Sequence, residues 1–206
     1  MRIPNDVHLA QNWRIHDAVA DFTLEDVWSL PTVVGGPDDF GGVVEMAARF
    51  DPAHAESLPT RLLWGIRDRL GEWFALGRIS TSAKTDDRLP IPGTQEHSIA
   101  DRLRADLRGT ANDVHFDHLP FIPLYRTANE FAAEISNQTV HGVMHLAWVH
   151  RGNGQHQGQM AVYVKPRGRF GHVYMAFIKP FRYWIVYPAL ERQIADAWAR
   201  RGQQTR

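Results

Sequence analysis

The sequence feature that most constrains the fold is a change in the spacing of apolar residues after about residue 120. In the segment 130–136, Phe131, Ala133 and Ile135 alternate with Glu130 and Glu134 and with small residues. Successive side chains of a β-strand point to opposite faces, so this alternation predicts an antiparallel strand with one face buried and the other in water. The chain must therefore contain a sheet.

Two further segments, 140–149 and 159–165, show the same spacing of two. The residues that connect them, RGNGQHQG at 151–158, are rich in glycine. Glycine favours tight turns because it adopts positive φ at no steric cost. We therefore predict a β-hairpin made of these two strands and a glycine-rich connection.

Apolar residues recur at three- and four-residue spacing in two other segments, which predicts helices there. The first is 58–77, and the second runs from 169 to about 200 with a broad aromatic stripe. Pro180 and Pro188 interrupt the second segment, and each removes a backbone donor, so we expect a bend at both. This order of elements predicts an α+β domain in which a curved antiparallel sheet grips a long, Pro-kinked C-terminal helix.

The first 57 residues give a less regular pattern. It predicts an extended stretch around residues 13–15 and turns at 35–37 and 41–42, where glycines cluster.

Residues 78–120 are polar, and only Ile99, Leu103 and Leu107 form a short helical stripe within 98–108. Long loops in compact domains usually serve a function. A chain of 206 residues is near the size of one domain. We therefore predict a single domain, 1–206, with a polar insertion or lid at about 78–120.

The charges argue against recruitment by net charge, because 23 Lys and Arg balance 23 Asp and Glu. We expect no nucleic-acid partner on this ground. The distribution is uneven, since residues 1–57 hold 3 basic and 10 acidic side chains and residues 167–206 hold 8 and 2. We interpret both ends as solvated surfaces, and the alternative is that the basic C-terminal segment contacts an anionic partner or a lipid surface.

The N-terminal residues lack the charged and apolar segments of a signal peptide, so we expect a cytoplasmic protein. The most apolar stretch, 170–190, carries Lys179 and Arg182, and charges within a bilayer are costly, so we predict no transmembrane segment. The chain has no cysteine, which excludes disulfides and thiolate chemistry.

Histidine and carboxylate residues are the remaining candidates for metal binding. His141 and His145 have the spacing of a helical metal site, but on a strand they lie about 13 Å apart, too far to share one ion. His115, Asp117 and His118 form the only local cluster, and we interpret it as loop surface because nothing else in the sequence fixes its geometry. We predict no metal site.

No motif for covalent catalysis or phosphate binding is visible. The serines lie in no G-x-S-x-G turn, and no G-x-G-x-x-G motif follows a predicted strand. We assign no catalytic residue and no cofactor. General acid–base catalysis by Glu134, Asp117 or a histidine stays open, because such a role depends on the geometry of a pocket.

Several segments together resemble the DUF2867 family over nearly the whole chain. They are LPTRLLWGIRDR (58–69), LPIPGTQ (89–95), DRLRADLR (101–108), TVHGVMH (139–145), QMAVYVKP (159–166) and KPFR with IVYPAL (179–182 and 185–190). The sheet followed by a long helix is also similar to the helix-grip, START/SRPBCC-like fold. That likeness implies a central cavity for hydrophobic ligands or for cyclisation reactions, whereas the family itself implies no particular activity.

The function that we predict is binding of a small apolar molecule between the sheet and the C-terminal helix. The residues expected to line the cavity are Met144, Trp148, Met160, Tyr174, Phe177, Phe181 and Trp184. Gln159 or His145 would orient the ligand or act as acid or base. One alternative is a cyclase- or hydratase-like enzyme that uses a histidine or carboxylate in that cavity. The other is an interaction module in which the aromatic, basic C-terminal helix meets a protein, a membrane or a second copy of the chain.

Overall fold

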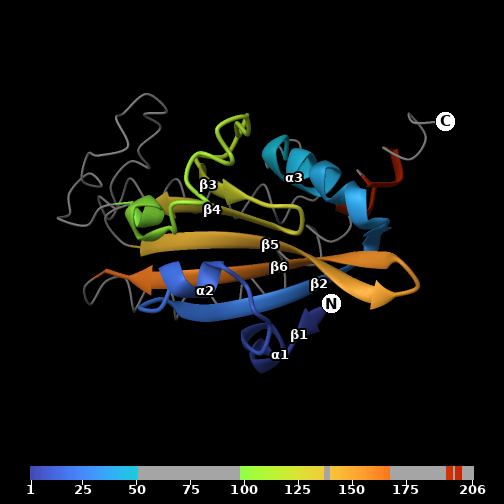
Figure 1. Cartoon of the computed structure of the whole chain (residues 1–206), viewed down its shortest axis with the longest axis horizontal. Coiled ribbons are helices and arrows are strands. Elements are labelled where there is room, and N and C mark those ends of the chain that lie inside the picture. The colour runs from blue at the N-terminus through green and yellow to red at the C-terminus, as the bar shows by residue number, and fades with distance from the viewer. Residues whose placement is uncertain (51–97, 137–139, 168–193, 197, 201–206) are drawn as a thin grey trace, which may run out of the picture.

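The computed structural model describes residues 1–50, 98–136, 140–167, 194–196 and 198–200. Its centre is a six-stranded antiparallel sheet with the strand order β1-β2-β6-β5-β4-β3 (Figure 1). The strands are β1 (Arg2–Ile3), β2 (Thr23–Gly35), β3 (Ile122–Arg126), β4 (Glu130–Ser136), β5 (Val140–Gly152) and β6 (Gln155–Pro166). The helices are α1 (Asn5–Leu9), α2 (Ile15–Ala18), α3 (Phe40–Ala48) and the short 3₁₀ helices η1 (Pro37–Asp39) and η2 (Ile99–Arg102). The α+β class that the sequence predicts is confirmed.

The hairpin of β5 and β6 is confirmed, and its connection is shorter than predicted. The ladder reaches Gly152 opposite Gln155, so only Asn153 and Gly154 form the turn. Their φ angles are 51° and 71°, as a two-residue type I′ turn requires at both central positions. This turn twists in the same sense as the strands and therefore fixes their register.

The first 50 residues differ most from the sequence-based prediction. Strand β2 pairs with β6 along most of its length, but register shifts interrupt the ladder between Leu24 and Asp26 and between Leu30 and Val34. Such irregularities break the period of two, so the strand leaves no clean sequence pattern. At residues 13–15, where an extended stretch was predicted, the chain turns into α2, which begins at Ile15.

Helix α3 occupies the position where a turn was predicted at residues 41–42. Phe40, Val43 and Val44 on this helix are buried in a common core. Packing of these side chains outweighs the low helix propensity of the two glycines. The turn predicted at 35–37 is confirmed, because β2 ends at Gly35 and η1 follows.

The sheet buries side chains on both faces. On one face, which we call the apolar face, α3 packs against a cluster that includes Leu30, Val33, Phe131, Ala133, Leu146, Trp148 and Met160. On the other, which we call the histidine face, lie Glu130, Glu134, His141, His145, Gln159 and Tyr163. Figure 1 shows α2 crossing the histidine face in front of the central strands. The prediction of a water-exposed face for 130–136 is wrong, since Glu130 and Glu134 are only 3% and 2% exposed.

The segment after η2 also covers the histidine face. Ile99, Leu103 and Leu107, the stripe noted in the sequence, are all buried against this face together with Ile15 of α2. The helix expected at 98–108 is limited to the single 3₁₀ turn of η2.

Two predicted helices fall mainly outside the described residues, namely 58–77 and most of 169–200. Residues 194–196 and 198–200 are helical. Ile194 and Trp198 pack against the apolar face, where the ring centroids of Trp198 and Trp148 lie 6.2 Å apart. No helix among the described residues is long and apolar enough to cross a bilayer.

Candidate functional site

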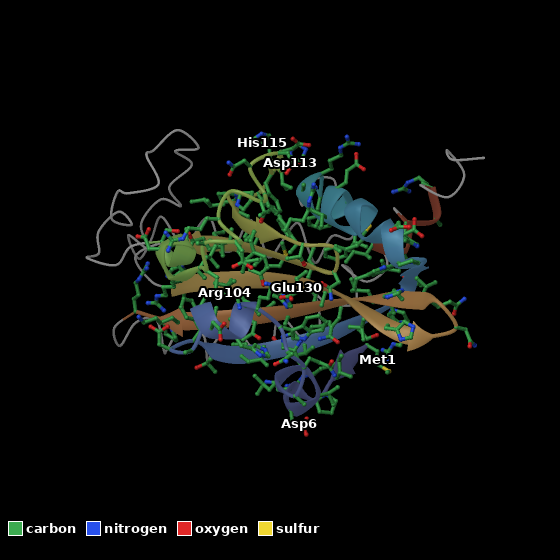
Figure 2. The ribbon with its side chains drawn as sticks, in the orientation of Figure 1. Met1, Asp6, Arg104, Asp113, His115 and Glu130 are labelled. Carbon is green, nitrogen blue, oxygen red and sulfur yellow. The ribbon has the colours of Figure 1, made fainter. Side chains whose placement is uncertain are left out.

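Glu130 and His145 form a buried pair at the centre of the histidine face. In the register of β4 and β5, Glu130 lies opposite Ala147 and Ala132 lies opposite His145, so the two side chains are diagonal neighbours on one face. Nε2 of His145 lies 3.3 Å from Oε2 of Glu130, and His145 has no exposed surface. Glu130 lies near the middle of the molecule in Figure 2, well inside the outline of the ribbon.

Two further donors serve the same carboxylate oxygen. The Tyr125 hydroxyl and the backbone N–H of Arg14 each donate to Oε2 of Glu130 at 2.9 Å. Burial alone would raise the pKa of Glu130, but the hydrogen bonds from His145, Tyr125 and Arg14 outweigh it and lower the pKa. Burial, reinforced by Glu130, raises the pKa of Tyr125. The site therefore holds a carboxylate beside a protonated phenol at neutral pH.

His145 is neutral in this environment. Burial lowers the pKa of its imidazole, although Glu130 opposes the effect. Because the carboxylate can only accept, Nε2 of His145 carries the proton, and Nδ1 is left with an unshared electron pair. A neutral imidazole oriented by a carboxylate can act as a general base through Nδ1.

Aromatic rings gather around this pair in what we call the ring cluster. Its members are His8 of α1, Trp13, His16 of α2, His145 of β5 and Tyr163 of β6. The ring centroid of His8 lies 5.4 Å from that of His145, 5.5 Å from that of His16 and 6.1 Å from that of Trp13. The centroids of Trp13 and His145 are 5.6 Å apart. Residues far apart in the chain thus share one enclosed site.

His8 is held by two polar partners. Gln159 Nε2 donates to Nδ1 of His8, which leaves the proton on Nε2, and Nε2 donates to the Tyr163 hydroxyl at 2.9 Å. Burial, reinforced by His145 and His16, lowers the pKa of His8 to about 3. Burial also lowers the pKa of His16. All three imidazoles of the ring cluster are therefore neutral near pH 7.

Three ring nitrogens of this cluster are buried without a hydrogen-bond partner among the described residues. They are Trp13 Nε1, His16 Nε2 and His145 Nδ1. Buried polar atoms in proteins are nearly always paired, so these three mark a place where the described part of the chain leaves its own polar groups unsatisfied.

A second buried pair, Glu134 and His141, lies four residues along each strand. Nε2 of His141 is 2.8 Å from Oε2 of Glu134, and the same oxygen accepts the backbone N–H of Ile99 at 3.1 Å. The Ser98 hydroxyl donates to the other oxygen of Glu134. The His141 ring contacts Phe22. This pair fixes the start of η2 to the sheet.

The predicted ligand-binding residues divide between the two faces of the sheet and the undescribed part of the chain. Met144, Trp148 and Met160 lie together on the apolar face. Tyr174, Phe177, Phe181 and Trp184 lie outside the described residues. The polar residues expected beside them, His145 and Gln159, are on the opposite face, so they do not join Trp148 or Met160 in one cavity.

The local cluster of His115, Asp117 and His118 is exposed. Figure 2 shows His115 at the outer edge of the molecule. Among the residues that the structure describes, no group of three or more His, Asp or Glu side chains is arranged to hold a metal ion.

Sequence reasoning missed Glu130, His8, Trp13, His16, Tyr125 and Tyr163 as site residues. One signal was available for Glu130, because charged residues at 130 and 134 face histidines at 141 and 145 once the two strands are paired. No comparable pattern exists in the first 16 residues, whose side chains reach the site only through tertiary packing.

Comparison with known proteins gives one match. A family model described as "Protein of unknown function (DUF2867)" matches residues 18–189. No curated protein and no solved structure matches the chain.

Proposed function

The chain belongs to the DUF2867 family, and from this starting point we propose that it is an enzyme-like domain that binds a small molecule at the histidine face. The His145–Glu130 pair transfers a proton there. The sequence leaves open an enzyme that uses a histidine or carboxylate, and we prefer this alternative to a purely apolar binding site.

The observation that carries this proposal is the unpartnered Nδ1 of the fully buried His145. Most buried side-chain nitrogens in proteins have a hydrogen-bond partner, so a free nitrogen on a fully buried ring points to a missing group. Here Glu130 orients one nitrogen and leaves the other as a base, which is the arrangement that general acid–base catalysis requires. Perturbed pKa values of neighbouring groups support the same reading.

Trp13 and His16 provide the side from which a molecule enters. Both are half-buried, whereas His8 and His145 behind them are fully buried. A small molecule would reach His145 past these two rings, and the planar rings would pack on it.

The test compares H145Q with H141Q. Both variants lose a buried histidine bonded to a glutamate on the same pair of strands, so both lose stability in a similar way. A library of small metabolites would be screened against the full chain by thermal shift and by native mass spectrometry for co-purifying molecules. A hit that binds or turns over with the wild type and H141Q, but not with H145Q, supports the proposal. Equal effects of the two variants, or no hit and no co-purifying molecule, would contradict it.

A second candidate function is the apolar ligand site predicted from the sequence. The observation that favours it is the contact of Ile194 and Trp198 with the cluster of Trp148 and Met160, since this places two apolar residues near the C-terminus on the apolar face. Extraction of the purified protein with organic solvent, followed by mass spectrometry, tests this candidate. A stoichiometric apolar molecule that is lost in M160A but retained in H145Q would favour it over the histidine face.

A further inference from the structure

The unpartnered nitrogens of the ring cluster specify the chemistry of the group that fills it. Leaving a buried polar atom without a partner costs free energy, so native proteins satisfy such atoms with water or with a ligand. His145 has no exposed surface, so any partner of its Nδ1 lies inside the protein.

The protonation of His145 determines the type of partner that it takes. Its Nε2–H donates to the Glu130 carboxylate, and the ring is neutral, so Nδ1 can only accept. The missing partner of His145 must therefore donate a hydrogen bond.

Trp13 requires a partner of the opposite hydrogen-bonding type. Its Nε1–H can only donate, so the missing partner of Trp13 must accept a hydrogen bond. The ring centroids of Trp13 and His145 lie 5.6 Å apart with an angle of 56° between the planes. The two rings are therefore neighbours, and one atom placed between the two unpartnered nitrogens would satisfy both.

A hydroxyl oxygen is the simplest atom that accepts and donates at once. An ionised carboxylate lacks the donor, and an ammonium group lacks the acceptor. We propose that Trp13 and His145 bind a hydroxyl group, either of a water molecule or of an alcohol. The Trp13 Nε1–H donates to its oxygen, and its O–H donates to His145 Nδ1.

This inference rests on the proposed function and names the group on which the base acts. The proton of the hydroxyl passes to Nδ1, the oxygen keeps the electron pair of the broken O–H bond, and the Glu130 carboxylate stabilises the imidazolium that forms. The hydroxyl that is activated is a nucleophile if it comes from water, and a part of the substrate if it comes from an alcohol.

Crystal structures of the full chain test the inference directly. In crystals grown without alcohols, we expect one oxygen within about 3.2 Å of both Trp13 Nε1 and His145 Nδ1. Soaks with ethanol, acetate and ethylammonium then distinguish the sources. Ethanol in place of the oxygen indicates an alcohol site, and retention of the oxygen in all three soaks indicates a water site. Acetate or ethylammonium at this position, an empty space, or pairing of both nitrogens with protein atoms would each overturn the inference.

The variant W13F keeps an aromatic ring but removes the donor, and we expect loss of the oxygen. The control W28F makes the same change beside the apolar face and leaves the oxygen in place. A ¹⁵N NMR spectrum of the wild type needs no variant, and it must show His145 protonated on Nε2 and unprotonated on Nδ1 at pH 7. The opposite tautomer would overturn the inference. If the oxygen is present but H145Q affects ligand binding no more than H141Q does, the proposed function fails while the hydroxyl site stands.

Discussion

The backbone N–H of Arg14 donates a 2.9 Å hydrogen bond to the Glu130 carboxylate, across 116 residues of sequence. A side chain at the start of β4 thus holds the chain between α1 and α2 in place over the histidine face. The same oxygen accepts from Tyr125 and His145, so the group that orients the base also attaches the cover of the site.

Replacing Glu130 should therefore affect stability as well as chemistry. In E130Q the charge that three donors share is lost, and a hydrogen bond to a buried charged group contributes about 1.5–3 kcal/mol. We expect the free energy of unfolding to fall by an amount in that range, measured by urea denaturation. The control E45Q removes an exposed carboxylate that pairs with Arg49 on α3, and it should change stability by less than about 0.5 kcal/mol. Equal effects of E130Q and E45Q would contradict this prediction.

Stability should decrease on acidification below about pH 6.5. The folded-state pKa of His8 is lowered to about 3, so between pH 6.5 and 3 the unfolded chain binds a proton that the folded chain does not. His16, His145 and Glu130 also have lowered pKa values, so their contributions have the same sign. Each such group reduces the stability by up to about 1.4 kcal/mol per pH unit within its window.

The pH dependence can be assigned with two histidine variants. Urea denaturation at several pH values between 4 and 7 should show a shallower slope for H8Q than for the wild type. H115Q, which changes an exposed loop residue, should leave the slope unchanged. A slope for H8Q as steep as that of the wild type would show that His8 is not the group responsible.

Replacing Gly154 or Gly41 with alanine should change the stability of the protein in opposite directions. Gly154 has a φ of 71° in the hairpin turn, so G154A should destabilise the protein by about 1–2 kcal/mol. Gly41 lies within α3, where an added Cβ meets no atom within 4 Å, so G41A should stabilise it by about 0.5–1 kcal/mol. Thermal unfolding of both variants measures the difference, and a gain in stability for G154A would show that the turn is not the type described.

Replacing Trp148 or Trp198 with phenylalanine should reduce stability by different amounts, although both side chains donate to carbonyls in the segment 34–36. Trp148 is 2% exposed and donates to the Gly36 carbonyl at 2.8 Å, whereas the less buried Trp198 donates to the Val34 carbonyl at 3.2 Å. W148F removes this hydrogen bond and leaves a gap in the core, which should cost about 2–4 kcal/mol. W198F should cost less than about 1 kcal/mol, because water can replace its hydrogen bond. Urea denaturation of the two variants under the same conditions provides the comparison.

The strands β4, β5 and β6 could be predicted because the alternation of their apolar residues follows from the local geometry of a strand. The turn at Asn153–Gly154 could be predicted from the glycines around it. Strand β2 could not, since its register shifts remove the period. Helix α3 could not, because Phe40 and Val43 stabilise it through contacts with distant residues rather than through local propensity.

Only part of the candidate site could be predicted from the sequence, because the rest depends on contacts between distant segments. The sequence places His141 and His145 on a strand, but the alternation of Glu130 and Glu134 with apolar residues predicts a face in water. Whether a polar face is solvated or buried depends on what covers it, and here the cover comes from α2 and from the residues around Ile99 and Leu103. Neither segment carries a sequence signal that says which face of the sheet it will meet.

The bonds of His8 also bear on the order in which the molecule folds. Its two polar partners, Gln159 and Tyr163, lie 151 and 155 residues further along the chain. During synthesis, α1 therefore leaves the ribosome long before β6 exists, and both polar partners of His8 are still missing at that stage. Contacts between such distant segments slow folding, because a long loop has to close before they form. The step that closes this loop also completes the ring cluster, so a chain that stops before it would have most of its sheet and the Glu130–His145 pair, but not the three rings of the N-terminal segment.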